Sequence, residues 1–225
     1  MTQTMTDIPQ FIRDADLETE FALPFVLACR QLAKEKHAKQ TRIGGRPYFT
    51  HVEGVAEILV SELGILNTQA IAAAYLHDVI EDGHMTREEL KQALIKFAQD
   101  DEYHADLTLL IVEDLTLELP RNWTDSMKEA IILGQLVRAG GAAYTYQVKL
   151  ADRLHNLRSM SRTKWSLDKQ LAYTLTGLRI YNLMTHMCRD TYTFTDEFHK
   201  VRMEMESLYC DLLAKNRRAK ENSAK

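Results

Sequence analysis

Helix-breaking residues are scarce in this chain, which has four prolines and nine glycines among its 225 residues. Proline and glycine interrupt regular structure more strongly than other residues, so their scarcity favours long elements. Apolar residues recur at helical spacing, and the strict alternation of a half-buried strand is hard to find. We therefore predict an all-α protein, a bundle of about eight to ten helices.

The helix bounds follow from caps and apolar faces. Thr50 with Glu53 forms a capping box, in which each residue satisfies a backbone N–H at the start of a helix. Asn67 is expected to cap the next helix, and Gly83 to end it. The predicted helices are 21–38, 50–63, 67–83, 87–98, 104–115, 124–139, 145–160, 167–188 and 195–215.

The chain shows no long linker and no internal repeat, so one main domain is expected. We predict an N-terminal extension over 1–20, the domain over 21–190 and a C-terminal helix packing on it over 191–215. The remaining residues, 216–225, are polar and charged and are expected to form a frayed or disordered tail.

Composition excludes several classes of protein. The net charge of −4 gives no global electrostatic case for binding DNA or RNA. The three cysteines, Cys29, Cys188 and Cys210, form no CxxC pair, so disulfides and a cysteine zinc site are not expected. No apolar run approaches the roughly 18 residues of a membrane span. We predict a cytoplasmic protein without a membrane partner.

The stretch AAAYLHDVIEDG, residues 72–83, carries apolar helical stripes that end in four ionisable groups. His77 and Glu81 are four residues apart, as are Asp78 and Asp82, so each pair shares a helix face. Burying unpaired carboxylates is very costly. Something should therefore neutralise them.

A second apolar helix, 148–160, also carries a polar pair, Asp152 and Asn156. His51 lies in the first turn of its helix, just after Thr50, a rigid place from which to present a ligand. Two histidines and two aspartates make a mixed nitrogen and oxygen site, which suits Mn, Fe or Zn better than calcium. The candidate ligands are His51, His77, Asp78 and Asp152.

Three extended motifs carry a family resemblance over roughly residues 25–185. TRIGGRPYFTH resembles the R-x-x-G-x-P-Y-x-x-H segment of the RelA/SpoT hydrolase domain, AAYLHDVIED resembles its A-x-L-H-D-x-x-E-D, and KLADRLHNLRSM resembles its K-L-A-D-R-L-H-N-x-R. The chain thus resembles the HD-domain metal-dependent phosphohydrolases. The resemblance implies an HD-domain helical bundle and a stand-alone small alarmone hydrolase.

That resemblance implies an activity and a metal. Such enzymes remove the 3′-pyrophosphate from ppGpp or pppGpp, giving GDP or GTP, and their usual metal is Mn²⁺, although another divalent transition metal is possible. The four candidate ligands would hold it. Glu81 and Asp82 match the family's acidic pair, which positions and activates the attacking water.

The resemblance also implies substrate contacts. Arg42 matches the arginine that packs against the base, where a guanidinium can stack on a ring. Asn156 matches a residue near the sugar, and Tyr48 belongs to the same nucleotide-contacting motif as Arg42. Lys149 and Arg153 either meet phosphate charge or hold the acidic pair.

The loop departs from the family pattern. Ile43 replaces the usual lysine, Arg46 the usual glutamate, and Val52 the proline that commonly follows the first histidine. The substrate could therefore instead be an adenosine alarmone, (p)ppApp, NADPH or a nucleoside 5′-monophosphate. A non-catalytic nucleotide-sensing module on the same scaffold is the third alternative. A homodimer is left open, since the last two helices could pack on the core or form a dimer face.

The other histidines have plainer interpretations. A lone histidine on an apolar helix is most often a hydrogen-bonded core residue, and His155 is expected to pack beside the site or to support a ligand. The remaining five lack an acidic constellation in the sequence and are expected to be surface or structural residues. They are His37, His84, His104, His186 and His199.

Overall fold

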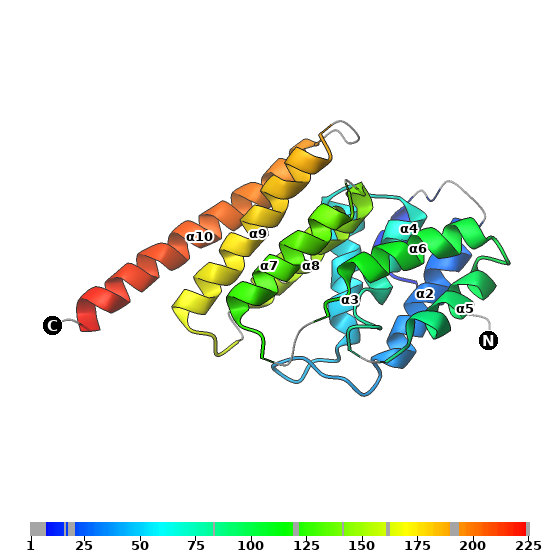
Figure 1. Ribbon diagram of the computed structural model, residues 1–225, viewed down its shortest axis with the longest axis horizontal. Helices are drawn as coiled ribbons and strands as arrows, with labels where there is room; N and C mark the ends of the chain where they lie inside the picture. Colours follow the sequence, from blue (N-terminus) through cyan, green and yellow to red (C-terminus); the bar gives the residue numbers. More distant parts are fainter. Residues whose placement is uncertain are drawn as a thin grey trace.

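The computed structural model describes residues 8–15, 17, 21–82, 84–118, 122–140, 142–160, 163–189 and 194–223. Over these residues the chain is a helical bundle without a strand (Figure 1). One isolated bridge joins Thr41 to Pro47. The all-α prediction is confirmed. The elements are α1 Gln10–Asp14, α2 Ala22–Lys36, α3 Phe49–Glu57, the π-helix η2 Ile58–Glu62, α4 Thr68–Leu76, α5 Arg87–Phe97, α6 Glu102–Leu115, α7 Asp125–Arg138, α8 Ala143–Ser159, α9 Leu167–Met187 and α10 Asp196–Ser223.

Helix α4 lies in the middle of the main bundle. Residues 69–76 are all buried, and the helix contacts α2, α3, α6 and α8. Its sequence, TQAIAAAYL, is apolar on every side, and a helix of that kind is stable only when neighbours surround it. Its small alanines let those neighbours pack closely. The segment that follows α4 therefore emerges inside the molecule.

Helix α4 is shorter than predicted. Asn67 caps it as expected, because its side chain accepts a hydrogen bond from the backbone N–H of Ala70 at 2.9 Å. The helix ends at Leu76, and residues 77–82 continue as turns. The predicted stop at Gly83 lies outside the described residues. The ionisable groups of this stretch thus sit on turns rather than on helix faces.

The predicted capping box at the start of α3 is wrong. The helix begins at Phe49, and the hydroxyl of Thr50 donates to the carbonyl oxygen of Pro47 at 2.8 Å. Glu53 accepts instead from the Arg30 guanidinium of α2, at 2.6 Å. This half-buried ion pair between two helices takes the carboxylate that a local cap would have used.

Helices α9 and α10 run antiparallel at one end of the molecule (Figure 1). Helix α10 continues past the expected end at residue 215 as far as Ser223, which favours the helix-end interpretation of this stretch over a disordered tail. Asn216 donates to the carboxylate of Asp168 at 2.7 Å, and Lys220 lies 3.3 Å from the same oxygen. Polar contacts with the start of α9 therefore support this part of the helix. The division into domains stays a prediction.

Two further expectations concern cysteines and membranes. Cys29 and Cys188 are buried and Cys210 is exposed, and no disulfide joins any two of them. Among the described residues, no helix has the length and apolar character needed to cross a bilayer.

Candidate active site

The four predicted metal ligands meet in one buried cluster. His51 lies in the first turn of α3, Asp152 on α8, and His77 and Asp78 directly after α4. The Nε2 atom of His51 is 3.3 Å from Asp152 Oδ1 and 3.6 Å from Asp78 Oδ2. The Nε2 atom of His77 is 3.1 Å from Asp78 Oδ2 and 3.9 Å from Asp152 Oδ1. Three segments far apart in the sequence thus supply one set of donors.

Both imidazoles turn Nε2 toward the carboxylates. The Nδ1 atom of His77 lies 2.8 Å from the carbonyl oxygen of Ala74, which can only accept a hydrogen bond, so Nδ1 carries the proton. Its buried Nε2 lies near Asp78 Oδ2 but does not meet hydrogen-bond geometry with any group of the described residues. The Nδ1 atom of His51 lies 2.8 Å from Nδ1 of His155, which confirms a supporting position for that residue. Metal-ligating histidines are typically held in this way.

The charges of the cluster favour a cation at its centre. Burial lowers the pKa of His77, but Asp78 and Asp152 outweigh burial and raise it to about 9. Burial raises the pKa of Asp78, yet His77 and His51 hold it well below its usual range. The C-terminal end of α4 adds a partial negative charge nearby. Two imidazoles and two carboxylates around an orphaned Nε2 therefore fit a divalent transition metal.

A cavity of about 740 Å³ opens onto the cluster, within the size range of small-ligand sites. Most of the predicted site residues line this cavity. Those that line it are Arg42, Tyr48, His51, Asp78, Glu81, Lys149, Asp152, Arg153 and Asn156.

The predicted substrate-contacting residues are linked to the predicted ligands. Tyr48 donates its hydroxyl to Asp78 at 2.6 Å, and Asn156 donates to Asp152 at 2.6 Å. Arg42 donates to Asn156 at 2.5 Å, and its guanidinium carbon lies 5.6 Å from the centre of the Tyr48 ring. The loop before α3 is therefore joined to α8 across the cavity.

The two basic residues of α8 have different partners. Lys149 Nζ lies 3.3 Å from Asp152 Oδ2, so its charge supports a predicted ligand. Arg153 places its guanidinium carbon 3.8 Å from the centre of the Tyr173 ring, and only 3% of the residue is exposed. A guanidinium held against a ring is fixed in place while its remaining donors stay available to a ligand.

The two predicted catalytic acids separate in the structure. Glu81 lines the cavity, and its Oε2 accepts a hydrogen bond from the backbone N–H of Leu117 at 3.2 Å. Burial and the charge of Asp78 raise the pKa of Glu81, against the opposing charge of Lys149. Asp82 is exposed, accepts from Gln40 at 2.7 Å and is not among the residues that line the cavity.

Comparison with known proteins supports the same family. A model of the HD domain matches residues 29–98. The MESH1 guanosine-3′,5′-bis(diphosphate) 3′-pyrophosphohydrolase of Xenopus tropicalis is 34% identical over 153 residues, which cover 66% of this chain and 78% of that protein. The chain belongs to the HD-domain pyrophosphohydrolases.

Two further relatives differ widely in length. The bifunctional (p)ppGpp synthase/hydrolase SpoT of Escherichia coli K12 is 30% identical over 187 residues, which cover 83% of this chain but 24% of SpoT. The solved structure of a metazoan ortholog of SpoT, described as hydrolysing ppGpp, matches with a TM-score of 0.60 and 21% identity, covering 83% of this chain and 94% of that one. That structure supports the HD-domain fold. HD hydrolases bind a divalent metal, and the cluster offers suitable donors.

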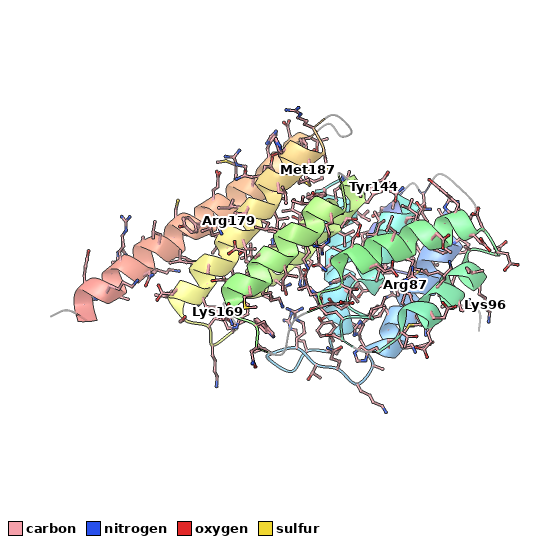
Figure 2. All side chains as sticks on the ribbon, in the orientation of Figure 1. Arg87, Lys96, Tyr144, Lys169, Arg179 and Met187 are labelled. Atoms are coloured by element: carbon pink, nitrogen blue, oxygen red, sulfur yellow. The ribbon has the colours of Figure 1, made fainter. Side chains whose placement is uncertain are left out.

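The sequence did not predict two tryptophans that also line the cavity, each with a lysine over its ring. Lys128 Nζ lies 5.4 Å from the centre of the Trp123 ring, and Lys169 Nζ lies 5.0 Å from that of Trp165. Lys169 projects near the start of α9 (Figure 2). The spacing of each lysine, four or five residues after its tryptophan, is the signal that could have indicated these pairs.

Two histidines also differ from expectation in this HD hydrolase. His37 and His84 were predicted to lack an acidic constellation, and that prediction is wrong. Together with Asp82 they form a second group whose potential ligand atoms lie within 4.8 Å of one another. The loop and the turn that hold them are close in space but far apart in sequence.

Gly54 of α3 gives a test of how His155 supports the cluster. A Cβ atom at Gly54 would lie 2.6 Å from both Cδ2 and Nε2 of His155, so Gly54→Ala should displace that ring. We expect a loss of about 1–3 kcal/mol in the free energy of unfolding and a metal affinity lower by about 10–100-fold. Urea unfolding and metal titration measure the two effects.

The matched control is Gly134→Ala on α7, where the nearest atom to a new Cβ is Arg138 Nη1 at 3.9 Å. Alanine at that helical position should leave metal affinity unchanged and stabilise by about 0.5–1 kcal/mol. Equal metal affinities for the two variants would show that His155 does not orient the ligand.

Proposed function

We propose that this chain is a metal-dependent 3′-pyrophosphohydrolase that converts ppGpp or pppGpp to GDP or GTP and pyrophosphate. The observation that carries the proposal is the meeting of His51, His77, Asp78 and Asp152 on a nucleotide-sized cavity. Its relative in Xenopus tropicalis carries this activity in its name.

The cluster is proposed to hold Mn²⁺ or another divalent transition metal. A metal there supplies Lewis acidity toward a phosphoryl oxygen and lowers the pKa of a bound water. Lys149 keeps Asp152 charged and in place, and the hydroxyl of Tyr48 does the same for Asp78. These neighbours fix the ligands before substrate arrives.

Glu81 is the residue that we propose accepts the proton of the attacking water. It faces the cavity, and burial raises its pKa, which brings a carboxylate closer to the range of an effective general base. The backbone N–H of Leu117 orients the carboxylate. The role of Asp82 beside it stays a prediction.

Substrate would lie in this cavity. Arg42 and Tyr48 are proposed to contact the base, Asn156 the sugar, and the buried Arg153 the phosphates. Lys169 also lines the cavity and adds positive charge that a diphosphate can use.

The loop before α3 is the reason to keep the alternative substrates. Ile43 and Arg46 both line the cavity and differ from the family pattern, and Arg46 reverses the usual charge there. An adenosine alarmone, NADPH or a nucleoside 5′-monophosphate therefore belongs in the same assay. The cytoplasmic location and the homodimer stay predictions.

The test is turnover of a nucleotide panel by purified protein loaded with Mn²⁺. Incubation with ppGpp should release GDP and pyrophosphate in equal amounts, measured by ion-exchange chromatography. Release of orthophosphate, or turnover of NADPH without turnover of either alarmone, would contradict the proposed reaction. Binding of ppGpp without turnover would favour the sensing module.

A further inference from the structure

A second group of donors lies outside the catalytic cavity, where the end of α2 meets the turn after α4. His37 is the C-cap of α2 and is 1% exposed, whereas Asp82 and His84 come from the turn. One potential ligand atom from each lies within 4.8 Å of the others. None of the three lines the catalytic cavity.

The two imidazole rings of this group have a ring-centre distance and an interplanar angle similar to those of the first cluster. The ring centres of His37 and His84 are 5.0 Å apart with an angle of 89° between the planes. For His51 and His77 the values are 5.3 Å and 72°. Each pair also has an aspartate within reach of both rings. The same chain thus contains two His/His/Asp groups with similar ring geometry.

Gln40 adds an oxygen donor to this group. Its Oε1 lies 2.7 Å from His37 Nδ1 and 3.0 Å from His84 Nε2, and its amide nitrogen donates to Asp82 Oδ2 at 2.7 Å. The amide therefore touches all three donors. An amide oxygen has two lone pairs, so Oε1 can keep accepting from His37 Nδ1 and still serve as a fourth ligand, which leaves Nε2 as the His37 atom that can bind a cation.

His37 carries a second indication of a ligand. Its Nε2 atom is fully buried and has no hydrogen-bond partner in the described structure. Burying a polar atom without a partner is unfavourable, and such atoms in native proteins often mark a missing ion or water. The unsatisfied nitrogen belongs to the most deeply buried of the three potential ligands.

We propose that His37, His84 and Asp82 form a second cation site, with Gln40 as an oxygen donor. Two imidazoles and one carboxylate suit Zn²⁺ in four-coordinate geometry far better than Ca²⁺ or Mg²⁺, which prefer oxygen ligands. A cation there joins residues 37–40 to residues 82–84. It therefore tethers the loop that carries Arg42 to the turn that carries Glu81.

The experiment counts ions in chelator-stripped full-length protein dialysed against Zn²⁺, using mass spectrometry of the metal. Wild-type protein should bind two ions per chain. His84→Gln should bind one, because it removes a half-buried ligand of the second site only. The matched control His186→Gln, an exposed histidine of α9, should keep two. Asp78→Asn, in the first cluster, should also bind one.

The double variant His84→Gln/Asp78→Asn should bind no Zn²⁺ ion. The ion counts of the single and double variants therefore distinguish the two sites without any measurement of catalytic activity. Circular dichroism checks that His84→Gln is folded, and Asp82→Asn, an exposed residue, provides a second variant that should lose the same ion. One ion in wild-type protein, or two ions in folded His84→Gln protein, would overturn the proposal.

Discussion

Asp78→Asn is expected to abolish hydrolysis, lowering kcat by about a thousandfold or more, because metal catalysis supplies several kcal/mol and about 1.4 kcal/mol corresponds to a factor of ten in rate. The carboxylate of Asp78 approaches both ligand histidines, at 3.1 and 3.6 Å. Asparagine keeps the size of the side chain and an acceptor for Tyr48 but removes the charge. The variant should therefore fold and fail to retain metal at the first cluster. Activity with ppGpp and metal content measure the two losses.

The matched control is Asp106→Asn on α6. Its carboxylate is half exposed and pairs with Lys91 at 3.1 Å, and such surface ion pairs contribute about 0–1 kcal/mol. Activity and metal content should both match those of wild-type protein. If Asp78→Asn keeps more than a tenth of wild-type activity, the cluster is not the catalytic metal site.

Glu81→Gln is expected to lower kcat by about a hundredfold to ten-thousandfold, the usual contribution of general acid–base catalysis. Glutamine preserves the acceptor for the backbone N–H of Leu117 and the shape of the cavity wall. It cannot take a proton from water. Metal content should stay at the wild-type level, which distinguishes this loss from that of Asp78→Asn.

The same variant should become more stable at neutral pH. Burial raises the pKa of Glu81, so the folded state binds its proton more tightly than the unfolded state does. The free energy of unfolding of wild-type protein therefore falls as pH rises through the usual and then the raised pKa. Removing the ionisable group should stabilise the protein at about pH 7 and change little at about pH 4, as followed by thermal unfolding.

Asp82→Asn is the natural comparison for Glu81→Gln. Asp82 is exposed and bonded to Gln40, away from the cavity. The kcat of Asp82→Asn should fall much less than that of Glu81→Gln. Equal losses in the two variants would show that the acidic pair acts as a unit and that Glu81 is not the principal base.

The convergence of the four proposed metal ligands was predictable because each occupies a locally determined position. His51 follows the start of a helix, Asp152 faces inward on an apolar helix, and His77 with Asp78 follows the most apolar helix of the chain. When those apolar faces are buried in one core, the polar groups beside them are brought to the same place. The motif resemblance then identified which polar groups belong together.

Features that depend on distant partners were not predictable. The end of α10 depends on bonds from Asn216 and Lys220 to a helix 48 or more residues earlier. The pairing of His37 with His84 likewise requires two turns to meet in space.

Under the proposed substrate contacts, the hydrogen bond between Arg42 and Asn156 would make nucleotide binding an exchange of hydrogen-bond partners. A nucleotide that uses both residues must first separate them, at a cost of about 0.5–1.5 kcal/mol for one hydrogen bond. A ligand with base and sugar replaces both lost contacts, whereas free pyrophosphate replaces neither. With the proposed contacts, the bond would hold Arg42 and Asn156 in place while the site is empty and would pass them to the base and sugar when a nucleotide binds.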